Sequence, residues 1–147
     1  MSMVMDRRKA KGRRESGIFV PLPCSVLNHP NFTRLSAKAV KLLIDMVSQL
    51  RFKSGGTRNN GDLTATWSIL KERGWKSRDS LHLSLQELLH YGFIKLTRQG
   101  GRHLPSLYAV TWWAIDACGG KLDIPETRVP SNEWKIEKEP WKRPKRK

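Results

Sequence analysis

The spacing of apolar residues changes character once along this chain, and that change constrains the fold more than any other feature. From Ser36 to about Phe52, apolar side chains recur every three or four positions, which is typical of one face of a helix. A second, shorter helix is expected at about residues 65–73, and an apolar helical face returns over residues 78–91. Residues 93–113 then switch to β-branched and aromatic runs around a glycine-rich loop, which indicates a hairpin. The sequence therefore predicts an α+β chain in which three helices precede two antiparallel strands.

Capping residues set the expected ends of these helices. Ser36 and Ser77 stand where the first and third helices need N-caps, and Asp62 or Thr64 is expected to cap the second. Gly92 marks the end of the third helix, because glycine readily adopts the left-handed conformation that closes a helix. The expected inward face of the third helix consists of Leu81, Leu85, Leu88 and Leu89.

The rest of the chain has no sustained period. Three prolines within residues 17–35 argue against helix there and favour an extended lead-in over the core. Residues 54–61 have the composition of a loop. We expect one domain over residues 17–117, preceded by a basic flexible arm at residues 1–16 and followed by a mostly irregular basic tail at residues 118–147.

Positive charge is the strongest compositional signal. Lys and Arg number 28 against 13 Asp and Glu, which gives a formal net charge of +15. Residues 1–16 hold six basic and two acidic side chains, residues 134–147 hold seven and two, and the remainder keeps 15 and 9. This balance favours a polyanionic partner, because each cation that meets a phosphate releases a condensed counterion. Solvated tails that only aid solubility are the alternative.

The order of the elements agrees with the charge. A short helix, a three-residue turn that begins at Gly74 and a longer helix form a helix-turn-helix order. Such a turn sets the two helices at a steep angle, so the second can enter a major groove while the first crosses the backbone. A hairpin that follows can act as a wing and reach the flanking phosphates. Both features indicate nucleic-acid binding.

Several motifs within residues 18–113 carry a resemblance to a known family. They are residues 19–23 (FVPLP), 35–39 (LSAKA), 59–63 (NNGDL), 74–81 (GWKSRDSL), 87–94 (ELLHYGFI) and 107–112 (LYAVTW). In these motifs the chain resembles winged-helix DNA-binding proteins of phages, plasmids and related bacterial mobile elements. The resemblance implies a winged helix-turn-helix fold, binding to double-stranded DNA, and a role as a transcriptional regulator or an origin-binding, replication-accessory factor. It does not extend to the two tails.

Helix geometry selects the side chains of the third helix that would meet DNA. With Leu81 and Leu85 inward, the outward residues are Asp79, Leu83, Gln86 and His90, flanked by Ser80, His82 and Glu87. Arginine can contact guanine through two hydrogen bonds, glutamine can do the same with adenine, and serine at a helix N-terminus can hold a phosphate. The expected DNA-binding residues of this helix are Lys76, Ser77, Arg78, Asp79, His82 and Gln86.

Local roles are the alternative for some of these residues. Arg78 and Asp79 can form caps and ion pairs within the helix, and His90 is expected to mark its C-terminus.

The hairpin supplies a second set of candidates. Its strands are expected at residues 93–99 and 106–113, and Gly100 and Gly101 at its tip would let the backbone approach a phosphate closely. A solvated turn with scattered charge is the alternative. The expected DNA-binding residues of the hairpin are Arg98, Gln99, Arg102 and His103.

The six tryptophans divide into two groups. Four of them fall on elements that need core side chains in so small a domain, namely Trp67, Trp75, Trp112 and Trp113. The other two, Trp134 and Trp141, lie in the basic tail, where they would either stack on bases or anchor the tail onto the domain.

Nothing in the sequence favours catalysis, a metal or a cofactor. The Gly-x-x-x-x-Gly-Lys-Ser/Thr phosphate loop is absent, and Cys24 and Cys118 have no metal-ligand or redox spacing. No apolar run approaches the roughly 18 residues of a membrane span. We therefore expect a cytoplasmic, nucleoid-associated protein that is not an enzyme, holds no cofactor and does not contact a membrane.

These observations predict a sequence-specific protein that binds double-stranded DNA and regulates transcription or replication of a bacterial mobile element. One alternative is a replication-initiation accessory factor that marks an origin and recruits a loader. Others are an RNA- or ribosome-associated winged-helix module, and an adaptor whose hairpin is a protein interface. A homodimer through the first helix, and a replication or transcription protein bound by the tails, are partners that the sequence leaves open.

Overall fold

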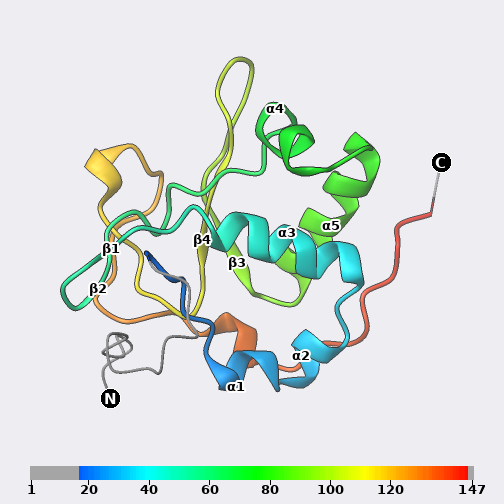
Figure 1. The fold of residues 1–147 in the computed structure, drawn as a ribbon, viewed down its shortest axis with the longest axis horizontal. Coiled ribbons are helices and arrows are strands. Elements are labelled where there is room, and N and C mark those ends of the chain that lie inside the picture. Colours follow the sequence, from blue (N-terminus) through cyan, green and yellow to red (C-terminus); the bar gives the residue numbers. More distant parts are fainter. Residues whose placement is uncertain (1–16, 146–147) are drawn as a thin grey trace.

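The computed structural model describes residues 17–145 and gives them a mixed α+β architecture. This part of the chain holds five α-helices and two antiparallel two-stranded sheets (Figure 1). The basic arm expected at residues 1–16 lies outside the described residues. The helices are α1 (Cys24–Leu27), α2 (Pro30–Thr33), α3 (Ala37–Val47), α4 (Trp67–Leu70) and α5 (Arg78–His90), and the strands are β1 (Phe52–Lys53), β2 (Gly56–Thr57), β3 (Ile94–Arg98) and β4 (Leu107–Val110). Three single turns of 3-10 helix complete the set, η2 (Lys71–Arg73), η3 (Cys118–Gly120) and η4 (Glu133–Lys135).

The first long helix, α3, begins where the sequence predicts and ends earlier. The Ser36 hydroxyl caps it by accepting a hydrogen bond from the backbone N–H of Ala39 at 3.2 Å. The helix stops at Val47 and not near Phe52. Leu50 continues the apolar spacing and is buried, but it lies in a turn, and Phe52 opens β1. The spacing alone therefore overestimated this helix, and the stretch expected as a loop contains β2.

Two short helices correct the expectation that residues 17–35 hold none. Pro30 is the first residue of α2, and Pro23 stands just before α1 at its N-cap position. Proline is compatible with the first turn of a helix, because the N–H that it lacks would have no partner there. Two of the three prolines of this region thus stand at helix starts.

The second expected helix, α4, begins at Trp67 and is capped by neither Asp62 nor Thr64. Instead the residues before it run beside β4, where Leu63 and Tyr108 exchange backbone hydrogen bonds of 3.1 and 2.9 Å. The Asp62 carboxylate pairs with Lys121 at 2.6 Å, so it is not free to cap. An extended pairing therefore replaces the expected first turn.

The third expected helix, α5, has the expected start and end but a rotated buried face. Ser77 caps it by accepting from the backbone N–H of Ser80 at 3.2 Å, and Gly92 follows its end with a φ of 78°. The buried positions are Leu81, Ser84, Glu87 and Leu88, so Glu87 points inward, against expectation. Leu85 is half-buried, and Leu89, expected inward, is 38% exposed.

The hairpin of β3 and β4 packs behind α5 and closes the core. The strands pair in antiparallel register from Ile94 opposite Val110 to Arg98 opposite Leu107, with a bulge between Leu96 and Arg98. The loop between them projects beyond the body, on the side where α4 and the N-terminal end of α5 lie (Figure 1).

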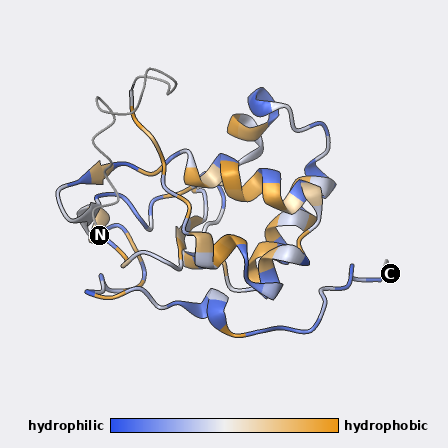
Figure 2. Cartoon of the chain, turned by 60° about the horizontal axis from the view of Figure 1, so that its bottom comes forward, coloured by the Kyte–Doolittle hydropathy of each residue, from blue (hydrophilic) through white to orange (hydrophobic). Residues whose placement is uncertain are grey.

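The core lies mainly between α3, α5 and the hairpin, and Figure 2 shows apolar residues concentrated on those two helices. Trp75 and Trp112 are buried, as predicted, while Trp67 and Trp113 are half-buried against the core. Apart from η3 and η4, the described chain beyond residue 117 is irregular, and it is packed against the domain, because Trp134 is 4% exposed within the core cluster.

Candidate nucleic-acid interface

A buried carboxylate fixes the turn between α4 and α5. Asp45 of α3 is 4% exposed and accepts hydrogen bonds from Trp75 Nε1 at 2.8 Å, Arg73 Nε at 2.9 Å and Lys41 Nζ at 3.0 Å. Burial alone would raise the pKa of Asp45, but these three donors outweigh it and hold the pKa below its ordinary value. Gly74 takes the left-handed conformation, with a φ of 95°, that reverses the chain there. The carboxylate thus binds the turn to α3.

The N-terminal end of α5 presents an arginine that is held in place. The Arg78 guanidinium lies over the Trp67 ring of α4, 5.6 Å from its centroid, and the side chain remains exposed. Lys76 is exposed beside it, and the hydroxyl of Ser77 is engaged as the helix cap. The sequence analysis assigned Trp67 to the core and missed this contact. Its sequence signal is an aromatic residue on the short helix just before α5.

A shallow pocket of about 150 Å³ lies where α3 meets the start of α5. Two of its lysines come from α3, and neither was predicted to contact DNA. Lys38 Nζ donates to Ser80 Oγ at 3.2 Å, while Lys41 bonds the Arg73 carbonyl as well as Asp45. The sequence signal that could have identified these two lysines is their spacing of three along an exposed face of α3. The lining residues are Lys38, Lys41, Gly74, Trp75, Lys76, Ser77 and Ser80.

Further along α5, two expected readers are paired with each other. Gln86 Nε2 donates to His82 Nε2 at 3.0 Å. His82 is exposed and Gln86 is half-buried, and Oε1 of Gln86 is enclosed with no hydrogen-bond partner among the described residues. Base contact by Gln86 would therefore require this pair to open.

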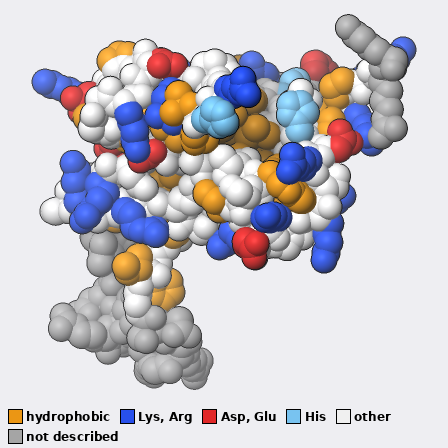
Figure 3. Space-filling model, turned by 90° about the horizontal axis from the view of Figure 1, so that it is seen from above, with side chains coloured by type: hydrophobic (Ala, Val, Ile, Leu, Met, Phe, Trp, Pro, Cys, Tyr) orange, Lys and Arg blue, Asp and Glu red, His pale blue; other side chains and the backbone are white. Residues whose placement is uncertain are grey.

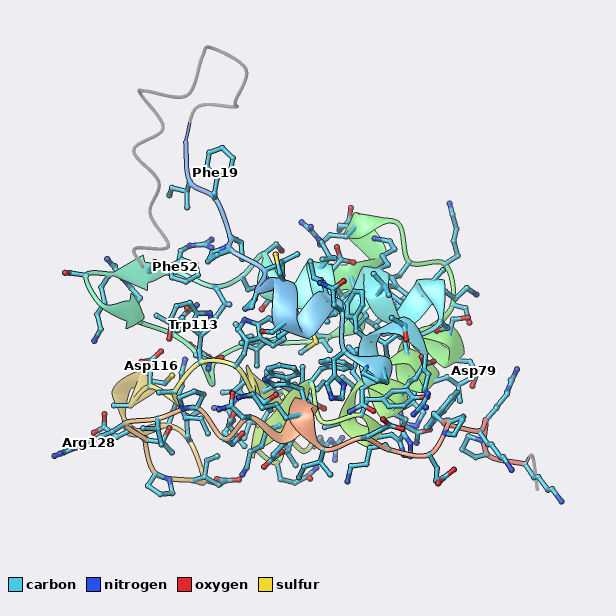
Figure 4. All side chains as sticks on the ribbon, turned by 90° about the horizontal axis from the view of Figure 1, so that it is seen from below. Phe19, Phe52, Asp79, Trp113, Asp116 and Arg128 are labelled. Carbon is cyan, nitrogen blue, oxygen red and sulfur yellow. The ribbon has the colours of Figure 1, made fainter. Side chains whose placement is uncertain are left out.

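The outward stripe of α5 is bordered by the C-terminal segment. The Asp79 carboxylate pairs with Arg143 at 3.3 Å, and His90 Nε2 donates to the carbonyl of Glu139 at 2.7 Å. Figure 4 shows Asp79 beside the C-terminal chain. His90 does end α5, as expected. However, the outward residues Asp79 and His90 both contact the C-terminal segment.

In the hairpin, only part of the expected set is free to meet a partner. Arg98 donates across the hairpin to the Pro105 carbonyl at 2.9 Å, and the backbone N–H of Gln99 donates to Asp123 at 2.9 Å. Arg102 and His103 are exposed at the tip, where His103 has a φ of 63°. The structure thus engages the Arg98 side chain within the hairpin and leaves the side chains of Gln99, Arg102 and His103 exposed.

Glycine at the base of the tip serves the hairpin itself. A Cβ atom on Gly100 would lie 2.6 Å from the Leu104 carbonyl oxygen and would also overlap the Ser106 N–H. Gly101 has no atom that its Cβ would meet within 4 Å. The close approach at Gly100 is therefore to the facing side of the hairpin loop, which accounts for that glycine without a phosphate.

Most of the acidic groups in this region are buried or paired. Residues 36–106 contain twelve Lys or Arg against five Asp or Glu. Glu87 is 5% exposed and accepts from the backbone N–H and the hydroxyl of Ser36 at 2.7 and 2.9 Å, Asp45 is buried, and Asp62 and Asp79 are in ion pairs. The fifth, Glu72 of η2, is exposed. Figure 3 looks onto this side of the molecule, where basic and histidine side chains are spread among apolar ones.

Comparisons with protein-family models, with curated proteins and with solved structures found no match to this chain. Among residues 17–145, no three His, Cys, Asp or Glu side chains are grouped so that they could hold a metal ion. In the same range, no helix has the length and apolarity to cross a membrane.

Proposed function

We propose that this chain is a winged-helix protein that binds double-stranded DNA sequence-specifically and regulates transcription or replication, and that it is not an enzyme. In this proposal α4 and α5 form the helix-turn-helix, and the β3–β4 hairpin is the wing. The observation that carries it is the common direction of the hairpin tip, α4 and the start of α5, in a region whose acidic groups are mostly buried or paired. The resemblance to phage and plasmid proteins extends the proposal to regulation of a mobile element.

Within this proposal, Arg78 is the principal base reader. Its guanidinium is exposed. Because Trp67 already holds the side chain, Arg78 loses less conformational entropy when it binds. Two hydrogen bonds from arginine to guanine contribute about 1–3 kcal/mol of discrimination against other bases. His82 and Gln86, one and two turns further along α5, are candidates for adjacent bases.

Phosphate contacts are assigned to groups on either side of Arg78. Lys38, Lys41 and Lys76 surround the pocket at the α3–α5 junction, and Arg102 and His103 extend from the hairpin tip. Contacts of this kind fix the register of a protein on the duplex and carry no sequence information directly. Two phosphate-binding groups that flank one reading helix match this division of roles.

The test is a competition titration with the full chain. A labelled 20-base-pair duplex is bound at about 0.15 M salt, where surface charges more than about 8 Å apart are screened, and is challenged with unlabelled duplex, structured RNA or single strand. We expect duplex to compete best, and a duplex selected from a random library to compete better than its scrambled form. More effective competition by RNA would favour the RNA-associated module, and the absence of binding to any nucleic acid would favour the protein adaptor.

Matched double variants localise the surface. Lys76→Ala with Arg102→Ala removes two cations from the proposed interface, and Lys53→Ala with Arg58→Ala removes two exposed cations near the β1–β2 turn. The first pair is expected to weaken duplex binding and the second to leave it nearly unchanged. Equal reductions from both pairs would mean that only net charge matters, and the proposed interface would be wrong.

A further inference from the structure

The C-terminal segment is attached to the domain through one buried side chain. Residues 133–141, here called the C-terminal strap, pass over Asn31 of α2, which is fully buried. Asn31 Nδ2 donates to the carbonyls of Trp134 and Ile136 at 2.9 and 2.8 Å, and its Oδ1 accepts from the backbone N–H of Lys138 at 2.9 Å. Both ends of one amide thus bond the strap.

Flanking side chains hold the same segment. His29 Nε2 donates to the Lys135 carbonyl at 3.1 Å, and its ring meets the Trp134 ring edge-on at a centroid distance of 5.5 Å. Arg34 donates to the Lys138 carbonyl at 2.7 Å and pairs with Glu137 at 3.2 Å. These bonds come from α2 and the residues on either side of it, so the strap lies in a fixed position on the domain.

From there the chain runs along α5 toward its N-terminal end. The Glu139 carbonyl meets His90, the backbone N–H of Trp141 donates to the Tyr91 hydroxyl at 2.8 Å, and Arg143 reaches Asp79. Asp79 and His90 are separated by about 16 Å of helix. Residues 139–143 in extended form span about 13 Å, and the Arg143 side chain covers the rest. The path is therefore nearly straight and antiparallel to the helix.

This path places cations beside the reading helix. Lys142, Arg143 and Lys145 are exposed where the strap leaves α5, at the end of the helix that also carries Lys76 and Arg78. Arg143 in addition neutralises Asp79, an exposed carboxylate that would otherwise repel a phosphate from this end. The docked strap thus places Lys142, Arg143 and Lys145 at the proposed interface.

We propose that residues 142–145, the anchored arm, are a phosphate-binding element that extends the duplex contact beyond the N-terminal end of α5. The inference rests on the proposed function and adds a third contact to α5 and the hairpin. A free basic tail loses conformational freedom along its whole length when it binds, whereas an arm that starts from a docked strap already has one end held beside α5. The arm therefore adds affinity for the backbone of any duplex without adding sequence preference.

The first test compares two triple variants of the full chain. Lys142→Ala, Arg143→Ala and Lys145→Ala together remove the charge of the arm, and Lys53→Ala, Arg58→Ala and Arg128→Ala remove the same charge from exposed positions elsewhere. Figure 4 shows Arg128 at the opposite end of the molecule from Asp79. The arm variant should weaken binding to selected and scrambled duplexes alike. Its slope of log affinity against log salt should fall by about 0.9 for each phosphate that the variant no longer neutralises.

The second test asks whether the strap stays docked on DNA. The backbone amides of Lys138 and Trp141 are bonded to Asn31 and Tyr91, so hydrogen exchange at these two amides reports docking directly. We expect protection in the free chain and equal or greater protection in the duplex complex. Loss of protection on binding, with tighter binding by the arm variant, would mean that the strap blocks α5 and is displaced, and it would overturn the inference.

The outcomes separate this inference from the proposed function. If the wild-type chain binds no duplex, the proposed function fails and the inference fails with it. If the wild-type chain binds but the two triple variants behave alike, the anchored arm is wrong while the proposed function stands.

Discussion

The side-chain amide of Asn31 donates to the carbonyl of Trp134 at 2.9 Å, across 103 positions in the sequence. This bond joins the second helix of the described chain to the segment near its end. Trp134 itself enters the core beneath Gly92, where a Cβ atom would lie 2.8 Å from the Glu133 carbonyl oxygen. The basic tail is therefore part of the folded unit at least as far as Trp141, which is packed against the core.

Removal of the Trp134 side chain should destabilise the protein strongly. Trp134→Ala vacates a buried core position and is expected to cost about 3–5 kcal/mol of unfolding free energy. Ile136→Ala, two residues away and 59% exposed, is the matched control and should change stability by no more than about 0.5 kcal/mol. Urea unfolding followed by circular dichroism measures both. Equal small effects would show that the strap contributes nothing to the core.

Asp45 should make stability depend on acid. Its pKa is lowered in the folded chain, so its contribution is complete above the unfolded value, near 3.8, and is lost as pH falls through the folded value. Unfolding free energies of wild type and Asp45→Asn should differ most at neutral pH and converge below about pH 4. A difference that stayed constant down to pH 2 would mean that the charge of Asp45 is not what the three donors stabilise.

The two cysteines should differ in reactivity. Burial, together with the carboxylates of Asp62 and Asp116, raises the pKa of Cys118 to about 11, whereas Cys24 is exposed on α1. Only about 0.1% of Cys118 would be thiolate at pH 8, and the thiolate is the form that alkylates. Iodoacetamide labelling followed by mass spectrometry should modify Cys24 first and Cys118 only as pH rises. Equal labelling rates in the native chain at pH 8 would contradict this order.

The elements that the sequence predicted correctly depend on local signals. Ser36 and Ser77 cap their helices through backbone N–H groups three residues ahead, so the signal and its effect lie within one turn. Gly92 likewise ends α5 through its own backbone conformation. The order of three helices and a hairpin followed from these signals and from apolar spacing.

Two further errors have a common physical origin in long-range contacts. Asp62 was one of two expected caps of α4, but it pairs with Lys121. Glu87 was expected outside, but it accepts from Ser36 at the N-cap of α3. The sequence left two roles open for Trp134, stacking on bases or anchoring the tail. In the structure Trp134 packs in the core, and its carbonyl accepts from Asn31, 103 positions away. No local pattern encodes such partners, because each depends on which segments the fold brings together.

Within the candidate site, the sequence analysis identified suitable residue types more reliably than the role of each residue. It selected Arg78 and Arg98 alike, but Arg78 lies exposed over Trp67 while Arg98 bonds across its own hairpin to Pro105. The distinction required the geometry of the bulged strand β3 and the position of α4. Exposed side chains at helix starts and loop tips can be predicted from sequence, whereas their intramolecular partners cannot.

If the proposed function is right, substitutions on α5 and on the hairpin should have different effects on sequence specificity. Arg78→Ala removes an exposed side chain whose contact with Trp67 contributes about 0.5–1 kcal/mol, so the domain should remain folded. Its affinity for a selected duplex should fall by about 1–3 kcal/mol, and its affinity for a scrambled duplex should fall much less. Arg78→Lys is the matched control, because it keeps the charge but cannot form the two-pronged contact, and it should lose specificity while it keeps nonspecific affinity. Gln86→Ala, which also removes the pair with His82, should lower affinity in the same direction.

Arg102→Ala at the hairpin tip should instead weaken selected and scrambled duplexes together, because a phosphate contact carries no sequence information. Arg98→Ala should affect binding through the shape of the hairpin, and its melting temperature should fall as well, since it loses the bond to Pro105. Binding titrations against both duplexes, with melting curves for each variant, measure these effects. If Arg78→Ala and Gln86→Ala leave both affinities intact while Arg102→Ala abolishes them, the hairpin is the primary recognition element and α5 is not the reader.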